Sequence, residues 1–152
     1  MSSFEGSLAV LLPEAGRLIT KRLEERLRVF HLTLAQFEIL EMLWTSSAGA
    51  ISQKSIIEMR GVEAATVGTT LSRLERDGWV MRLPDPDDRR GKLVVATEKA
   101  CERRDYIRVA IVQLEIELQD FLDIKTELKG IIARFRNDDR GDLGGGRGVI
   151  PR

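Results

Sequence analysis

Hydrophobic residues recur with a helical period through most of the chain, and one interval near its middle shows a different pattern. Between residues 63 and 78, Val67, Leu71 and Leu74 have the i, i+4, i+7 spacing of a buried helical stripe. Other positions of this segment, including Thr66, Thr69 and Arg73, are small, hydroxylated or basic. The spacing predicts a helix with one face in a core and a polar face of mostly short side chains.

The different pattern follows directly, in residues 78–97. There GWVMRL is followed by PDPDDRRG and then by KLVVAT. Two short β-type runs joined by a turn rich in Pro, Asp and Arg predict a hairpin with a cationic tip.

Residues 33–50 predict a further helix and a loop. Thr33 and, three residues later, Gln36 form a capping-box pattern at the start of the helix LAQFEILEMLW. SSAGA, which follows, predicts a loop. The positions that the pattern directs into a core are Phe37, Leu40 and either Trp44 or Leu43.

A short helix and a turn then lead to the helix of residues 63–78. Ser52 is a suitable N-cap for a helix that ends near Met59, and Gly61 marks a turn after it. Two helices joined by a short turn with Gly form the outline of a helix-turn-helix. The second helix can approach a major groove closely and offer donors to base edges or phosphates. Residues 52–97 therefore predict a winged helix-turn-helix for duplex DNA.

Long helices flank this segment on both sides. Residues 7–30 are amphipathic, and Pro13 is expected at or near the first turn, where proline is tolerated. Thr97 caps a second long helix with apolar residues on two sides, and such a helix usually packs on two sides. After a break near Asp123 a last helix follows. We expect part of this apolar surface to meet a second chain.

Composition narrows the function classes. Lys and Arg total 24 and Asp and Glu total 24 in 152 residues, so a DNA site needs local segregation of charge, and the neutral balance counts mildly against one. One Cys and one His build neither a structural zinc site nor a disulfide framework. No nucleophile–base pair or phosphate loop assembles, so we expect no enzyme, no metal and no cofactor. A lone Cys, no signal peptide and no membrane span suit a cytoplasmic protein.

Three motifs in register resemble the MarR family, named for regulators of multiple antibiotic resistance. LTLAQFEIL resembles the family's L-T-x-x-Q entry to its second helix, and ISQKSIIEMRGVEAATVGTTLSRLERDGWV resembles its helix-turn-helix pair. PDPDDRRGKLVVAT resembles its wing, with the D-x-R-G signature at Asp88, Arg90 and Gly91. The similarity extends over residues 11–136.

The resemblance implies a homodimeric, cytoplasmic transcription regulator, with repression of an operator as the default. In this family the first and last helices interlock as the dimer. Each recognition helix enters a major groove and each wing the neighbouring minor groove. Many members leave DNA when a small aromatic or phenolic acid binds between the dimerisation helices and the lobe. Others sense peroxide through a Cys near the N-terminus, where this chain has none.

The predicted fold class is mainly α with a small β-wing. Residues 33–97 form the winged helix-turn-helix lobe, residues 1–32 an N-terminal dimerisation helix, and residues 98–136 C-terminal dimerisation helices. Residues 137–152 are rich in Gly and charge and predict a disordered tail.

Departures from the family pattern concern packing and the recognition helix. His31 stands where the family often has Gly, Ile57 replaces a small residue, and Arg60 replaces an apolar one. Gly68 and Thr69 stand where bulkier or basic residues are frequent. Gly68 costs about 1 kcal/mol of helix propensity relative to Ala, so a close approach to DNA is worth testing there.

The candidate DNA contacts lie on the helix of residues 63–78 and on the hairpin turn. Thr66 and Thr69 offer hydroxyl and methyl groups to bases, and Arg73 offers a bidentate fork. Arg90, at the hairpin tip, can enter a narrow minor groove. The full set is Ala65, Thr66, Gly68, Thr69, Ser72, Arg73, Asp88, Arg89, Arg90 and Lys92.

Each of these assignments has a structural alternative. The helix face can be an ordinary polar face, with Arg73 paired to Glu75 or Asp77. Asp88 is expected to hold Arg90 by a charge-assisted bond, against the alternative of an exposed ion pair worth about 0–1 kcal/mol. Arg89 and Lys92 are either phosphate contacts or solvated charges.

Residues outside this set keep open roles. Cys101 lies beside cations near a helix start, which favours a reactive thiolate, but a packing role is favoured over redox sensing. His31 is either a ligand or pH-sensing group or a boundary residue, and Trp44 and Trp79 either pack in a core or line an effector cleft. Rival functions are a winged helix that binds protein and not DNA, or a small-molecule carrier built on a dimer cleft.

Overall fold

The computed structural model describes residues 6–121 and 123–141, and side chains as far as Asn137. It contains two compact units, residues 1–114 and 115–152, which are described separately below. The elements in chain order are α1 Leu8–Leu27, a 3-10 turn Arg28–Phe30, α2 Leu34–Thr45, β1 Ala50–Ser52, α3 Gln53–Arg60, α4 Ala64–Arg76, β2 Val80–Pro84, β3 Lys92–Ala96, α5 Glu98–Glu117, a 3-10 turn Gln119–Phe121 and α6 Ile124–Gly141. The predicted fold class, mainly helical with a small β-wing, is confirmed.

The predicted helix caps are present. At the start of α2 the Gln36 backbone N–H donates to Thr33 Oγ1 (3.3 Å) while the Thr33 N–H donates to Gln36 Oε1 (2.9 Å), which completes the capping box. Ser52 Oγ accepts from the Ser55 N–H (3.0 Å) at the start of α3. Gly61, with φ of +62°, ends α3 in the left-handed conformation that favours glycine. These local signals fix the two ends of the helix-turn-helix.

His31 occupies the turn between α1 and α2 with φ of +56°. A left-handed conformation costs a side-chain-bearing residue about 1–2 kcal/mol relative to glycine. This conformation is the physical reason that a Gly suits this position and that His is a departure there.

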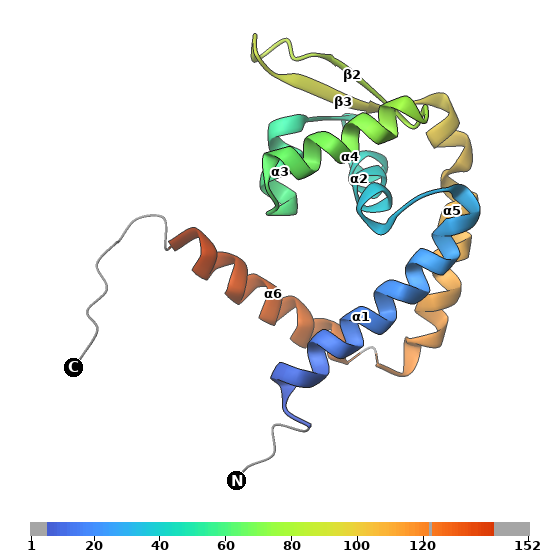
Figure 1. Cartoon of the computed structure of the whole chain (residues 1–152), viewed down its shortest axis with the longest axis vertical. Coiled ribbons are helices and arrows are strands. Elements are labelled where there is room, and N and C mark those ends of the chain that lie inside the picture. Colours follow the sequence, from blue (N-terminus) through green and yellow to red (C-terminus); the bar gives the residue numbers. More distant parts are fainter. Residues whose placement is uncertain (1–5, 122, 142–152) are drawn as a thin grey trace, which may run out of the picture. The chain divides into compact units, whose positions relative to one another are not determined.

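A three-stranded antiparallel sheet in the order β1-β3-β2 packs beside α4. β3 pairs with β2 from Val80↔Ala96 to Pro84↔Lys92, and with β1 from Ala50↔Val95 to Ser52↔Leu93. The β2–β3 hairpin was predicted, whereas β1 lies where the sequence predicted the end of a loop. Figure 1 shows the hairpin running back alongside α4.

The core of the first unit lies between α2, α4, the sheet and the first half of α5. Val67, Leu71 and Leu74 of α4 are all buried, as their spacing predicted. In α2 the buried apolar residues are Ile39, Leu40 and Leu43, while Phe37 and Trp44 pack against the core from its margin. The expectation that Phe37 enters the core was therefore too strong. Leu43, and not Trp44, is the central residue of that turn.

α1 differs from the prediction at Pro13. The helix begins at Leu8, so Pro13 is its sixth residue and lies one turn deeper than expected. A proline there has no N–H to donate to the carbonyl of Ala9, and the helix tolerates the loss of one bond. Within the described residues, no helix is long and apolar enough to cross a membrane.

The two apolar sides of α5 are treated differently by the fold. Ala100, Ile107 and Leu114, spaced by seven residues, are buried against the first unit. Tyr106 and Val109 on other faces are 69% and 64% exposed. The prediction of two apolar sides is thus confirmed, and one of them is uncovered in the single chain.

The second unit contains α6, which begins at Ile124 after a break at the predicted place. Its exposed apolar residues recur at helical spacing, at Ile124, Leu128, Ile132 and Phe135. The helix continues to Gly141, so residues 137–141 are helical and were wrongly assigned to the tail. The rest of the predicted tail, residues 142–152, lies outside the described residues.

Candidate nucleic-acid interface

One side of α4 faces solvent because the opposite side supplies the core. The residues that this outer face of α4 presents are Ala65, Thr66, Gly68, Thr69, Ser72 and Arg73. All are exposed except Gly68, which is partly covered. The helix places six of the predicted contact residues on one surface.

The threonine hydroxyls of α4 are not equivalent. Thr69 Oγ1 donates to the Ala65 carbonyl within the helix (3.0 Å), and Thr70 Oγ1 donates to the Thr66 carbonyl (2.9 Å). Their hydroxyl protons are therefore engaged, which leaves the Thr69 oxygen as an acceptor and its methyl as an apolar contact. The hydroxyl of Thr66 has no such bond and remains available as donor and acceptor.

Arg73 forms no ion pair with the described residues, so the alternative of a structural pair with Glu75 or Asp77 is wrong. Glu75 binds Arg82 and Asp77 binds Arg76 (Nε to Oδ1, 2.8 Å), so both expected partners are engaged elsewhere. Among the described residues no acceptor holds the Arg73 guanidinium. Its charge is available to a phosphate or base edge.

Gly68 has no packing reason to be a glycine. A Cβ built at this position meets no heavy atom of the protein within 4 Å, and its φ is not in the left-handed region. A glycine inside a helix costs about 1 kcal/mol relative to alanine. No contact within residues 6–121 and 123–141 explains that cost.

The wing tip, residues 85–92, is held by backbone hydrogen bonds. Asp85 Oδ1 accepts from the Asp87 N–H (2.9 Å), and Asp88 Oδ1 accepts from the Arg90 N–H (2.9 Å). The Gly91 N–H donates to the Asp88 carbonyl (2.9 Å), and its carbonyl accepts from the Asp85 N–H (3.2 Å). Asp88 therefore holds the backbone of Arg90, and the predicted bond to its guanidinium is absent.

Gly91 lies at the most tightly packed point of the tip, where a side chain would press on its neighbours. A Cβ there would lie 3.0 Å from Asp88 Cβ and 3.2 Å from Asp85 Cβ, closer than ordinary packing allows. The D-x-R-G signature thus describes a turn: a carboxylate that accepts a backbone N–H, a free arginine, and a glycine that permits closure.

The cations of the wing tip point into solvent. Arg89, Arg90 and Lys92 are exposed, and the two guanidiniums make no ion pair with the described residues. The tip also holds Asp85, Asp87 and Asp88, so acids and cations are equal in number. Two of the carboxylates accept backbone N–H groups, which leaves the arginine side chains of the tip free to bind a partner although the tip has no net charge.

An ion pair joins the base of the wing to α4. Arg82 of β2 donates to Glu75 of α4 from Nε (3.0 Å) and Nη2 (2.6 Å), and its backbone N–H donates to the other carboxylate oxygen (3.2 Å). Arg82 Nη2 also donates to Ser72 Oγ (3.3 Å). The pKa of Glu75 lies below its ordinary value chiefly because of the guanidinium hydrogen bonds, with burial opposing and Lys92 adding a small effect.

The end of α4 is tied to the start of α5. Thr97 Oγ1 donates to the Gly78 carbonyl (2.6 Å) and accepts from the Ala100 N–H (3.3 Å), so it caps α5 and holds the turn after α4. Lys99 Nζ donates to the Asp77 carbonyl (2.7 Å) and lies 4.5 Å from the centre of the Trp79 ring. This junction leaves α4 and α5 little independent freedom.

Sequence reasoning missed the roles of Arg82, Glu75 and Lys99. The signal for Arg82 was the strand alternation: Val80 and Arg82 share the face of β2 that turns to α4, and a charged residue on an inner face requires a partner. Lys99 carried no signal in the sequence, because its partners are a carbonyl and a ring brought together by the fold.

The remaining candidates lie apart from this surface. Cys101 is exposed on α5, and Trp79 is buried in the core. Trp44 is half-buried beside Arg108, whose guanidinium lies 5.8 Å from the ring centre and binds Glu41 (2.9 Å). Hydrogen bonds from that guanidinium to Glu41 raise the pKa of Arg108.

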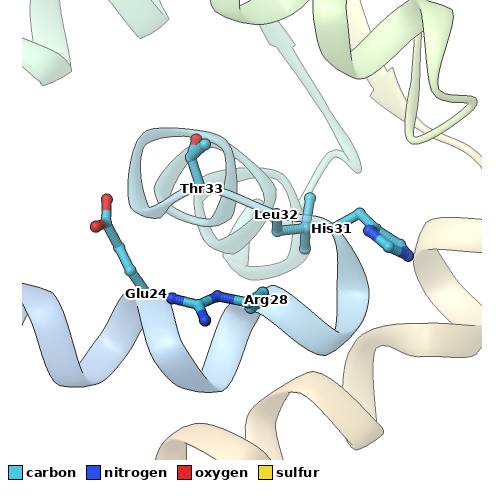
Figure 2. Close-up of a pocket in the computed structure, with 5 residues that line it drawn as sticks. All are labelled: Glu24, Arg28, His31, Leu32 and Thr33. Carbon is cyan, nitrogen blue, oxygen red and sulfur yellow. The ribbon is translucent and has the colours of Figure 1, made fainter.

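His31 lines a hollow of about 320 Å³ at the junction of α1 and α2, together with Glu24, Arg28, Leu32 and Thr33. Figure 2 shows Glu24 near the end of α1, Arg28 just after it, and Thr33 at the start of α2. The hollow is of small-molecule size, and its charged side chains are exposed. It is a separate feature from the surface of α4 and the wing.

The geometry defines a class of protein. A helix-turn-helix whose second helix is exposed, followed by a hairpin whose tip carries exposed arginines, is a winged helix-turn-helix. The sequence model described as "MarR family" matches residues 32–92, which span this lobe from α2 to the wing.

Curated relatives agree with that class. The HTH-type transcriptional regulator YwoH of Bacillus subtilis is 39% identical over 124 residues, which cover 81% of this chain and 88% of YwoH. The multiple antibiotic resistance protein MarR of Escherichia coli is 36% identical over 89 residues, 54% of this chain and 60% of MarR. The chain belongs to the MarR family of winged helix-turn-helix transcriptional regulators.

Solved structures extend the likeness to the fold. A mutant of MarR from Escherichia coli complexed with operator DNA has a TM-score of 0.73 at 25% identity, with 89% of this chain and 99% of that chain covered. AbsC of Streptomyces coelicolor has a TM-score of 0.76 at 24% identity, with 90% and 97% covered, and supports the fold alone.

Proposed function

We propose that this chain acts as a homodimeric, sequence-specific DNA-binding regulator, with α4 in the major groove and the wing tip at the neighbouring minor groove. The observation that carries the proposal is the pairing of surfaces on one lobe. α4 exposes a smooth face with an unpaired Arg73, beside a wing whose Arg89 and Arg90 are free of partners. The complex of a MarR mutant with operator DNA supports the same use of this fold.

The proposed dimer rests on the uncovered apolar residues. On α1 and α5 these include Leu18, Tyr106 and Val109, each more than half exposed. Burying such side chains contributes about 1.5–3 kcal/mol each for fully covered positions, so a second copy is the natural partner. Two recognition helices in one dimer would then lie about 34–36 Å apart, one turn of B-form DNA.

The test of DNA binding is a fluorescence anisotropy titration. The protein is added to labelled duplex from upstream of its own gene and to a shuffled duplex, each at two salt concentrations. We expect selective binding whose log K falls with log salt by about 0.9 for each phosphate contacted. Equal affinity for both duplexes, or none, together with a stable protein complex, would favour the rival reading of a protein-interaction module.

The proposal includes repression and release by a small aromatic or phenolic acid. Support for an effector comes from the hollow at the α1–α2 junction, where Arg28 can bind a carboxylate beside Leu32. We expect a hydroxybenzoate to raise the melting temperature and to weaken DNA binding in the wild type but not in Arg28→Ala. A reporter gene behind the operator should fall silent with the protein and recover with the acid. If the acid changes neither property, the effector proposal fails and DNA binding stands.

A further inference from the structure

We propose that Glu75, Arg82 and Ser72 form a strut that positions the wing relative to α4, so that DNA affinity depends on residues that contact no DNA. The inference rests on the proposed DNA-binding function and identifies the residues that set the position of the wing relative to α4. The strut joins two elements, since Glu75 and Ser72 lie on α4 and Arg82 lies on β2.

The contacts of the strut restrain both position and angle. Both carboxylate oxygens of Glu75 are used: Oε2 accepts from Nε (3.0 Å) and Nη2 (2.6 Å) of Arg82, and Oε1 accepts from its backbone N–H (3.2 Å). A fork with a backbone bond beside it allows little rotation between helix and strand. A single-point contact between two charges would not give this restraint.

The backbone bond also satisfies an edge strand. β2 is at the edge of the sheet, because the strand order is β1-β3-β2. Its outward N–H groups have no neighbouring strand, and the N–H of Arg82 donates to Glu75 instead. Glu75 thus takes the place that a further strand would occupy.

The wing acts as a lever on which this restraint has a large effect. Arg82 lies three residues before Asp85, where the tip begins, which corresponds to about 10 Å of extended strand. A tilt of about 10° at the base would then move the start of the tip by about 2 Å, which is enough to break a hydrogen bond. Placing the guanidinium of Arg90 in a groove therefore needs the base of the hairpin held.

The strut gives Ser72 a different role from the one that its exposed position predicted. Its hydroxyl accepts from Arg82 Nη2 at 3.3 Å, so it orients the guanidinium from the α4 side. Arg82 is a positioning residue in the same sense, because its Nε and Nη2 donors bind Glu75 and Ser72 of α4.

A double-mutant cycle distinguishes positioning from a general loss of stability. In anisotropy titrations Glu75→Gln should raise the dissociation constant about fivefold in the wild type but less than about twofold in the Arg90→Ala background. The coupling is expected because a displaced wing lowers DNA affinity only while Arg90 is present to make the contact. An equal fold-change in both backgrounds would overturn the proposal.

The matched control is a second fork between an arginine and a glutamate on two elements of the first unit. Glu41 of α2 binds Arg108 of α5 at 2.9 and 3.4 Å. Glu41→Gln removes a similar ion pair and should show no coupling to Arg90→Ala. Coupling of the same size there would mean that the cycle reports stability and not wing position.

A measurement without DNA keeps the inference separate from the function. The heteronuclear NOE of the wing amides, residues 85–91, should fall in Glu75→Ala and stay at the wild-type value in Glu41→Ala. Unchanged wing amides in Glu75→Ala would overturn the strut even if the wild type binds DNA. Conversely, a lower heteronuclear NOE in Glu75→Ala, together with a wild type that binds no DNA, would support the strut and contradict the proposed function.

Discussion

The outer face of α4 and the wing tip are both exposed, but they offer a partner opposite kinds of surface. α4 presents short side chains, one unpaired cation at Arg73, and a glycine, Gly68, that no contact in the described part of the chain requires. The wing tip presents Arg89 and Arg90 on a turn that is held by its own carboxylates. The first surface is defined by its short side chains, and the second by its exposed guanidiniums.

The difference indicates a division of labour for a protein with no net charge. Phosphate contacts supply affinity and depend on salt, while base contacts and close fit supply selectivity. We therefore expect changes in the wing to alter affinity for every duplex, and changes on α4 to alter the preference between duplexes.

The largest effect is expected for Arg90→Ala. Removing the tip guanidinium should raise the dissociation constant for operator and shuffled duplex alike, by about 10- to 100-fold for a groove contact worth 1–3 kcal/mol. The slope of log K against log salt should also become shallower. Arg103→Ala, an exposed arginine on α5, is the control and should bind like the wild type. Unaltered binding by Arg90→Ala would remove the wing from the interface.

Gly91→Ala comes next and tests the shape of the tip without removing a charge. The added Cβ would lie 3.0 Å from Asp88 Cβ, so we expect Asp88 to shift and to carry the backbone of Arg90 with it. We expect an affinity loss of several-fold and a thermal stability nearly that of the wild type, because the tip is exposed. Normal affinity would show that the turn geometry is irrelevant to binding.

Gly68→Ala separates stability from binding on α4. The substitution should stabilise the lobe by about 1 kcal/mol, because alanine is the better helix former and its methyl meets no protein atom. It should nonetheless weaken selective binding severalfold if DNA approaches closely. Gly16→Ala in α1, where a Cβ likewise meets nothing, should stabilise without changing DNA affinity. Equal DNA affinity of Gly68→Ala and Gly16→Ala would contradict a close approach of DNA to Gly68.

The smallest effect concerns the pH dependence of the strut. Because the pKa of Glu75 is lowered in the folded protein, its ion pair contributes stability above the ordinary glutamate pKa, and the contribution is lost as pH falls through the lowered value. The difference in melting temperature between wild type and Glu75→Gln should therefore be largest near pH 7 and shrink below about pH 4. For a pair this exposed the contribution is under about 1 kcal/mol. A difference that grows on acidification would contradict the assignment.

Local signals predicted the parts of the fold that depend on neighbouring residues. The capping box of Thr33, the cap at Ser52 and the left-handed Gly61 all operate within four residues, and each was found where expected. The stripe of Val67, Leu71 and Leu74 predicted the buried side of α4 in the same way.

Features that depend on distant residues were missed or misassigned. β1 is three residues long and exists because β3 has a free side, which no three-residue pattern can show. The sequence offered Glu75, with Asp77, only as an alternative partner for Arg73, whereas the partner of Glu75 lies across a turn on β2. Asp88 was expected to bind the guanidinium of Arg90, but it accepts from the backbone N–H. A sequence signature names the residues and does not show which of their atoms donate.

The most direct test of the account is a hydroxyl-radical footprint of the operator with wild type and Arg90→Ala. The account predicts that the wild type protects two minor-groove segments flanking a centre of two-fold symmetry. It predicts that Arg90→Ala, at a concentration that saturates the duplex, loses those flanking protections and keeps the rest. Identical footprints, or protection without two-fold symmetry, would contradict the claim that paired wings and α4 helices hold one duplex.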